Sequence, residues 1–321
     1  MNRTLALMPA IAAAGLAIGC GNSGSSLPQT PPTEVKKLTS DGIRNIGAVA
    51  SNPDGTTFYA LAFDEEGRPG VFGADSANGD VSPLFVGAPL LYPSDIAVTC
   101  DGRQVLVADM GLGVPDTEFA ADRTAEHATG GIHTIATGSG ERSDFSASGI
   151  GRASGLIVSV DCQTVYVTGW TPDGAPALFT VPVEGGGATV VAQGAPLVSP
   201  TGVHVDEENI AWVMDHSARG ANGEGLLFAI NPDGDVSEVL SGLGMGRHGG
   251  VSLTPGGKTA VIPVRDDMTG KTQLLTANTE TMEVNTVPTP DIEHPTGVAS
   301  ARNAPVMVVA GEYGLHIATF E

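Results

Sequence analysis

Two aspartates end corresponding apolar segments of the sequence and could supply oxygen ligands to a cation. Asp109 follows the apolar residues 105–108, and Asp215 follows residues 210–214. Carboxylate oxygens coordinate divalent cations, so two converging carboxylates could form part of a metal site or of a metal-assisted hydrolytic site. The alternative is structural, because an aspartate at a strand end often accepts hydrogen bonds from backbone N–H groups of its own loop.

Further polar and aromatic residues follow equivalent strands and complete a set of candidate ligand-binding residues. The set consists of Asp109, Trp170, Asp215, His216, His248, Arg265, Asp266 and Glu312. His248 is followed by two glycines, which let a ligand approach the backbone, although a surface histidine without a role is the other interpretation. Trp170 could stack on a sugar or an aromatic ligand, or it could anchor its own loop.

No motif in the sequence identifies a catalytic nucleophile or a tightly bound cofactor. There is no Gly-x-Ser-x-Gly segment in a strand-to-helix context, no haem-attachment cysteine pair and no phosphate-binding loop. We therefore expect no cofactor and leave only a divalent cation open.

The elements that position these residues are set by a repeat. Six four-residue segments, which we call openers, have a form close to Pro-Thr-Gly-Val, as in Pro200-Thr201-Gly202-Val203. They begin at residues 45, 93, 153, 200, 248 and 295, so the steps are 48, 60, 47, 48 and 47 residues. Each opener leads into a strand, an Asp/Gly turn, a second strand, a polar loop and two more strands. A repeat of this length with four strands is typical of a β-propeller.

The two ends of the repeat region predict how the ring closes. The sixth repeat supplies three apolar segments, residues 297–299, 306–310 and 315–320, and then the sequence stops. Residues 34–39 precede the first opener and belong to no repeat of their own. We expect them to form the missing outer strand of the sixth blade, which removes the open sheet edge. The predicted fold is an all-β, six-bladed propeller with four-stranded blades over residues 34–321.

This plan gathers the openers and the loops between second and third strands on one face, where all eight candidates fall. The second repeat is about a dozen residues longer than the others, and the excess lies within residues 110–130. A long loop in a compact domain is often a binding loop, and a solvated surface loop is the alternative.

The openers and the apolar strand that ends in aspartate resemble the NHL and SMP-30/gluconolactonase-like propellers. The resemblance is carried by Pro200-Thr201-Gly202-Val203 with Asp215, and by Pro93-Ser94-Asp95-Ile96 with Asp109. It covers nearly the whole repeat region and implies the six-bladed fold, whereas propellers host many functions.

Lactonase-type members of that superfamily hold a divalent cation with a Glu, an Asn and an Asp. The resemblance implies that the Asn and the Asp occupy the second opener position. Those positions here are Ile46, Ser94, Ser154, Thr201, Gly249 and Thr296. None of them is an amide or a carboxylate, which argues against that hydrolase activity.

The N-terminal region predicts export and a lipid anchor. Arg3 precedes the apolar residues 5–18, which are too few to span a bilayer as a helix. The segment Leu16-Ala17-Ile18-Gly19-Cys20 resembles a bacterial lipobox, which implies lipidation of Cys20; an ordinary signal peptide is the alternative. We therefore expect a signal peptide over residues 1–19, a lipidated cysteine with a flexible tether over residues 20–33, and a location in the cell envelope, facing the periplasm or the outside.

Two more cysteines, Cys100 and Cys162, remain in a compartment that favours oxidation. They fall at the first turn of consecutive blades, on the same face of the ring. A disulfide is one interpretation, and two separate buried thiols are the other.

The charge of the chain limits its partners. The formal net charge is −21 at pH 7, and such an acidic chain repels nucleic acid. Together these features predict a lipid-anchored extracytoplasmic propeller that binds a protein, a peptide or a glycan. The alternative is a divergent metal-assisted hydrolase or lyase with its site at the channel mouth, built on residues such as Asp109, Asp215, His248 and Glu312.

Overall fold

The structure is a computed structural model that describes residues 27–39, 42–111, 129–216, 225–244, 250–265, 272–289, 292 and 294–320. Within this part the chain is all-β, and it contains no helix long and apolar enough to cross a membrane. Cys20, His248, Asp266 and the inserted residues 112–128 lie outside the described residues.

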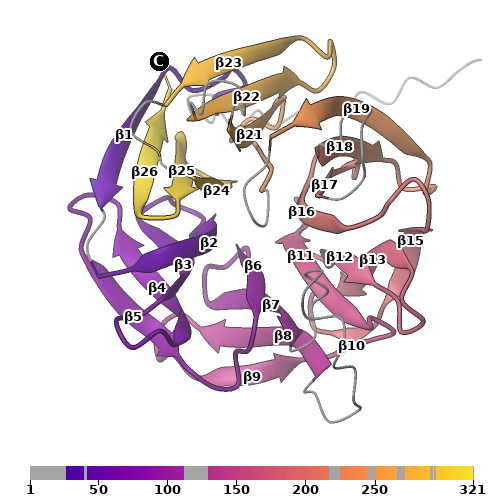
Figure 1. Cartoon of the computed structure of the whole chain (residues 1–321), viewed down its shortest axis with the longest axis horizontal. Coiled ribbons are helices and arrows are strands. Elements are labelled where there is room, and N and C mark those ends of the chain that lie inside the picture. The colour runs from indigo at the N-terminus through magenta and orange to yellow at the C-terminus, as the bar shows by residue number, and fades with distance from the viewer. Residues whose placement is uncertain are drawn as a thin grey trace, which may run out of the picture.

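Six four-stranded antiparallel sheets form the blades of a ring (Figure 1). Blade 1 consists of β2 (Arg44–Ser51), β3 (Thr57–Phe63), β4 (Pro69–Asp75) and β5 (Val81–Val86). Blade 2 consists of β6 (Pro93–Val98), β7 (Gln104–Gly111), β8 (Thr129–Ala136) and β9 (Arg142–Phe145). Blade 3 consists of β11 (Arg152–Val158), β12 (Thr164–Trp170), β13 (Pro176–Pro182) and β15 (Thr189–Gln193).

The other three blades follow the same order from the centre outward. Blade 4 consists of β16 (Pro200–Val205), β17 (Ala211–Asp215), β18 (Gly225–Ile230) and β19 (Val236–Leu243). Blade 5 consists of β20 (Ser252–Leu253), β21 (Thr259–Arg265), β22 (Thr272–Asn278) and β23 (Val284–Pro288). Blade 6 consists of β24 (Pro295–Ser300), β25 (Val306–Gly311), β26 (Gly314–Thr319) and β1 (Glu34–Thr39). A small parallel pair, β10 (Ala147–Ser148) and β14 (Gly186–Gly187), lies beside blade 3.

The ring closes through β1, as the sequence predicts. β1 pairs antiparallel with β26, so that Glu34 lies opposite Thr319 and Lys37 lies opposite His316. The N-terminal strand thus supplies the outer strand of the last blade and covers an edge that would otherwise be open.

The core lies between the blades. The second strands are the most buried elements; in β7, for example, every residue after Gln104 is buried. Leu106 of blade 2 packs in one apolar cluster with Val167 and Phe179 of blade 3. Each blade has a neighbour on both faces, which explains why these strands are continuous apolar runs and do not alternate with polar residues.

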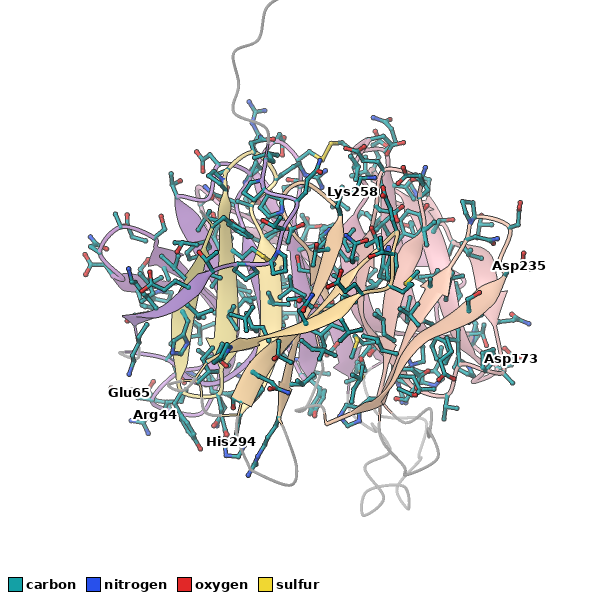
Figure 2. All side chains as sticks on the ribbon, turned by 90° about the horizontal axis from the view of Figure 1, so that it is seen from above. Arg44, Glu65, Asp173, Asp235, Lys258 and His294 are labelled. Atoms are coloured by element: carbon teal, nitrogen blue, oxygen red, sulfur yellow. A yellow bond between two sulfur atoms is a disulfide. The ribbon has the colours of Figure 1, made fainter. Side chains whose placement is uncertain are left out.

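The two ends of the ring differ, and we name them by their connections. The turn face carries the turns between first and second strands, including residues 99–103, 159–163 and 254–258. The loop face carries the openers and the loops between second and third strands. In the side view, Lys258 lies at the turn face, and Arg44 and His294 lie at the opposite end (Figure 2).

The first described residues cross the turn face at blade 5. The N–H of Gly256 donates to the carbonyl oxygen of Pro28 at 2.7 Å, and the Thr259 hydroxyl donates to that of Gln29 at 2.7 Å. A side chain at position 256 would collide with this segment, because a Cβ there would lie 2.6 Å from Cγ of Gln29. The chain then reaches blade 6, where the N–H of Thr33 donates to the carbonyl oxygen of Thr319.

Candidate functional site

Asp109 and Asp215 act as acceptors for the backbone. The carboxylate of Asp109 is 1% exposed and accepts hydrogen bonds from the N–H groups of Leu91, Tyr92 and Gly111 at 2.7–2.9 Å. The carboxylate of Asp215 is fully buried and accepts N–H groups of Val198 and Ser199 at 2.8–3.1 Å. In both blades the aspartate ties the end of the second strand to the segment that enters the first strand, which is the structural role considered as the alternative.

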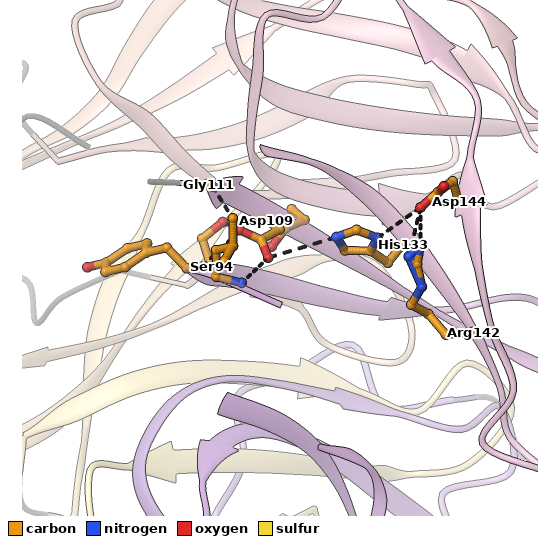
Figure 3. A network of polar contacts seen from close by, with 9 residues as sticks. Ser94, Asp109, Gly111, His133, Arg142 and Asp144 are labelled. Atoms are coloured by element: carbon orange, nitrogen blue, oxygen red, sulfur yellow. Dashed lines mark hydrogen bonds and ion pairs between the residues drawn. The ribbon is translucent and has the colours of Figure 1, made fainter. Parts of the chain in front are cut away.

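The remaining polar contacts of Asp109 run outward along blade 2 (Figure 3). Nε2 of His133 lies 3.8 Å from Oδ2 of Asp109, and Nδ1 of His133 lies 3.4 Å from Oδ1 of Asp144. Asp144 in turn pairs with Arg142 at the outer strand. This row of polar side chains links the strands of the blade.

The other described candidates come from separate blades of the loop face. Trp170 is half-buried, and the guanidinium of Arg152 stands 5.6 Å from its ring centroid. Arg265 is exposed, and its Nη1 lies 3.4 Å from Nδ1 of His294. His216 follows β17 in blade 4, and the backbone of Glu312 in blade 6 bonds to His294 and Ile46. Among the described residues no group of three His, Cys, Asp or Glu side chains could hold a metal ion.

A cavity of about 220 Å³ occupies the central channel. Its wall is formed by the first strands of all six blades, and Leu27 of the docked N-terminal segment also lines it. None of the described candidate residues lines this cavity. Five ionisable residues do so: Asp95, His204, Asp206, Glu207 and Arg302. None of them was among the sequence-based candidates.

Asp95 is the first of these residues. It stands at the third position of its opener, where the other five openers have glycines: Gly47, Gly155, Gly202, Gly250 and Gly297. The glycine allows the next blade to come close, since a Cβ at Gly155 would lie 2.0 Å from the carbonyl oxygen of Thr201. In blade 2 the carboxylate instead accepts the N–H of Ile96 and, from blade 3, that of Leu156, both at 2.9 Å. Burial raises the pKa of Asp95 to about 7, against the opposing effect of these two hydrogen bonds.

His204 lies on the channel wall of blade 4. Its Nδ1 is 3.5 Å from Oγ of Ser252 in blade 5, which is 3.2 Å from Oγ of Ser300 in blade 6. Burial lowers the pKa of His204 to about 3, and the positive charge of Arg302 acts in the same direction. The imidazole is therefore neutral at physiological pH and a weak base. Because Ser252 is only 1% exposed, this pair does not form an accessible nucleophile with its base.

Arg302 crosses the turn-face end of the channel. It follows the first strand of blade 6, and its guanidinium donates to the carbonyl oxygens of Val158, Ser159 and Val160 in blade 3 at 3.0–3.2 Å. Burial lowers its pKa, while the nearby Asp161 raises it. The other two ionisable residues of the wall are acidic: Asp206 is buried and accepts a hydrogen bond from the indole N–H of Trp212 at 3.0 Å, and Glu207 is exposed. Chemically, the wall thus carries three acidic side chains, one neutral imidazole and one arginine that donates to three backbone carbonyl oxygens.

The disulfide between Cys100 and Cys162 is present and confirms that prediction. It joins the first turns of blades 2 and 3 on the turn face, and its Cα atoms are 5.9 Å apart. Blades that are neighbours in the ring are therefore also linked covalently.

No protein-family model and no curated protein sequence matches the chain. Solved structures with a similar fold include a chain of a nidogen/laminin complex, with 17% identity, a TM-score of 0.60, and coverage of 80% of this chain and 85% of that one. A gluconolactonase from Xanthomonas campestris has 14% identity, a TM-score of 0.62, and coverage of 94% and 99%. TolB from Acinetobacter baumannii has 13% identity, a TM-score of 0.58, and coverage of 78% and 56%. At these identities the similarity establishes the propeller fold alone.

Proposed function

We propose that the protein is a lipid-anchored, extracytoplasmic binding module that presents its loop face to a protein, a peptide or a glycan. The observation that carries the proposal is the use of Asp109 and Asp215 as backbone acceptors. These carboxylates are the groups on which a metal-assisted site was expected to depend. Because the carboxylate oxygens of Asp109 and Asp215 accept hydrogen bonds from the backbone within their blades, they fix the loops of the loop face. This face therefore serves as a rigid binding surface.

The position of the N-terminal segment supports this orientation. Leu27 lies at the channel on the turn face, and Pro28 and Gln29 are bonded to blade 5 there. Cys20 precedes Leu27 by seven residues, so the chain between them spans at most roughly 25 Å. A lipid on Cys20 therefore holds the turn face near the membrane, and the loop face points away from it.

The loop face also carries groups suited to recognition. Tyr313 is 51% exposed and Val198 is 51% exposed, and Arg265 is exposed beside His294. Tyrosine and arginine are enriched in protein interfaces. One of the similar structures comes from a nidogen/laminin complex, a precedent for a propeller in a protein assembly.

The second candidate is a metal-assisted hydrolase, and the similarity to a gluconolactonase over 94% of the chain is the observation that favours it. Such an enzyme needs a cation with open coordination positions and oxygens that are free to bind it. Metal analysis of the purified protein, together with assays of lactone hydrolysis with added divalent cations, separates the two functions. Stoichiometric metal and metal-dependent turnover would establish the enzyme and overturn the binding-only proposal.

Site-specific photo-crosslinking in the cell envelope tests the binding function. A photoreactive residue is placed at Trp170 or Tyr313 on the loop face, and at Lys258 or Arg103 on the turn face as matched controls. We expect discrete crosslinked products from the loop-face positions, which disappear when excess unlabelled protein competes. Crosslinks from the turn-face positions alone would show that the proposed face is wrong. Cys20→Ser is expected to release the protein from the membrane fraction.

A further inference from the structure

We propose that the central cavity binds a compact molecule that carries a primary ammonium group, with the carboxylate of Asp95 as its counter-ion. This inference goes beyond the proposed function and does not depend on it. The cavity lies within the ring, whereas the partner surface proposed above is the loop face.

The first argument is the isolation of the Asp95 charge. Its two hydrogen-bond donors are the neutral N–H groups of Ile96 and Leu156. Among the described residues no lysine, arginine or histidine forms an ion pair with it. Charged groups in protein interiors are normally paired, because removing them from water is costly. The rise of its pKa to about 7 has burial as its main cause, which agrees with a missing counter-charge.

The second argument is the position of Asp95 on the cavity wall. Asp95 is half-buried although it lies within the ring, and it lines the cavity. Five of the six openers have glycine at this position, so the fold does not require an acid there. The aspartate adds a negative charge to a wall whose other ionisable residues are His204, Asp206, Glu207 and Arg302. The carboxylate of Asp206 is engaged within its own blade, where it accepts hydrogen bonds from Glu208, Ile210 and Trp212.

The third argument is the supply of further acceptors beside this carboxylate. An ammonium group has three N–H donors and needs several acceptors. In an antiparallel strand the N–H and C=O of one residue point to the same side. The N–H of Leu156 points toward Asp95, and therefore so does its carbonyl oxygen. The carbonyl oxygen of Val158 also faces the channel, where it already accepts a hydrogen bond from Arg302.

The size and the remaining walls restrict the ligand. A volume of about 220 Å³ is below the range of roughly 300–1,000 Å³ that is usual for drug-sized ligands. Val203, Val251 and Val298 are among the residues that line the cavity, together with His204, whose imidazole is neutral. The net charge of −21 raises the local concentration of cations around the molecule. These properties fit a short aliphatic or benzylic amine better than an anion or a sugar acid.

Calorimetric titration of the purified full-length protein tests the proposal. The probes are n-butylamine, 1,4-diaminobutane and benzylamine, each paired with the alcohol of the same shape: 1-butanol, 1,4-butanediol and benzyl alcohol. We expect at least one amine to bind saturably and at least about tenfold more tightly than its alcohol, because a charge-assisted bond is lost in the alcohol. Asp95→Asn is expected to weaken that amine by at least about tenfold.

Two further variants keep the test decisive. Asp95→Gly restores the residue found in the other five openers, so it is expected to fold and to lose amine binding. Glu65→Gln removes an exposed carboxylate at the rim of the loop face and is expected to bind the amine like the unaltered protein (Figure 2). Equal affinity for amines and alcohols, unchanged binding in both Asp95 variants, or no binding of any amine up to about 10 mM would each overturn the proposal. None of these results would change the crosslinks expected from the loop face.

Discussion

Arg302 of blade 6 donates a hydrogen bond of 3.0 Å to the carbonyl oxygen of Val158 in blade 3, on the opposite side of the ring. Two further bonds reach Ser159 and Val160. In a six-membered ring each blade packs only against its two neighbours, so a contact between opposite blades is an additional connection. This one crosses the turn-face end of the channel.

The first prediction is that Arg302 stabilises the ring. Arg302→Met removes three charge-assisted hydrogen bonds and should lower the free energy of unfolding by about 1–3 kcal/mol, measured by urea denaturation. The matched control is Arg103→Met, since Arg103 is 85% exposed and its nearest carboxylate, on Asp101, is 3.9 Å away. That control should be almost neutral. Equal effects of both substitutions would contradict a role for the cross-ring bonds.

The second prediction concerns the disulfide. Cys100 and Cys162 are 62 residues apart, and closing a loop of that length restricts the unfolded chain. Replacing both cysteines by serine should lower the free energy of unfolding by about 4 kcal/mol. Thiol titration of the exported, non-reduced protein should find neither cysteine free. Two reactive thiols would mean that the pair does not form in the cell.

The third prediction is that the ring depends on its N-terminal strand. Deletion of residues 1–39 removes β1 and leaves the outer edge of β26 unpaired, so the protein should aggregate or melt at a much lower temperature. Deletion of residues 1–26 is the control, because it leaves both β1 and the segment docked on Gly256 in place. Equal melting temperatures of the two deletions would show that closure through β1 contributes little.

The fold could be predicted from the sequence because the opener repeat depends on the pairing of strands that follow one another along the chain. Opener spacing and Asp/Gly turns determine which strands are neighbours in a blade, and the three-stranded remainder at the C-terminus required a partner such as residues 34–39. Neighbouring strands and neighbouring turns follow from chain order, which is why the Cys100–Cys162 pairing could also be anticipated.

The channel residues could not be found in the same way. Which first-strand side chain meets the next blade depends on sheet twist and ring packing, and neither leaves a local pattern. Asp95 did leave a signal, because it is the one acidic residue at an opener position where the other five openers have glycine. Arg302 lies in the turn after the first strand of blade 6, and only the closed ring brings it to Val158.

The fourth prediction follows from the raised pKa of Asp95. The folded protein favours the protonated carboxyl of Asp95. The contribution of this group to the free energy of unfolding is therefore fully present below its pKa in the unfolded chain, which is 3.8. It is lost as the pH rises through about 7. Asp95→Asn removes this dependence. Relative to the unaltered protein, its free energy of unfolding should therefore rise between pH 4 and pH 8. A difference that is constant over this range would mean that Asp95 titrates normally.

The fifth prediction has the opposite sign and concerns His204. The folded protein favours the neutral imidazole, since the pKa is lowered from 6.5 to about 3. This contribution is present above pH 6.5 and is lost as the pH falls toward 3. His204→Gln keeps a neutral side chain at every pH, so its stability relative to the unaltered protein should rise as the pH falls over that range.

Between pH 4 and pH 6.5, Asp95 lowers the free energy of unfolding as the pH rises, whereas His204 increases it. These two effects oppose each other, so together they should change the stability of the unaltered protein little over this range. Each single substitution removes the pH dependence that comes from one residue, so the stability of the variant follows the pH dependence that comes from the other. Urea denaturation of Asp95→Asn and of His204→Gln at pH 4, 5 and 6 gives the difference in free energy of unfolding between each variant and the unaltered protein. This difference should rise with pH for Asp95→Asn and fall with pH for His204→Gln. The double variant should then return close to the pH dependence of the unaltered chain. Slopes of the same sign in both single variants would show that one of the two groups is not held in the protonation state that the channel favours.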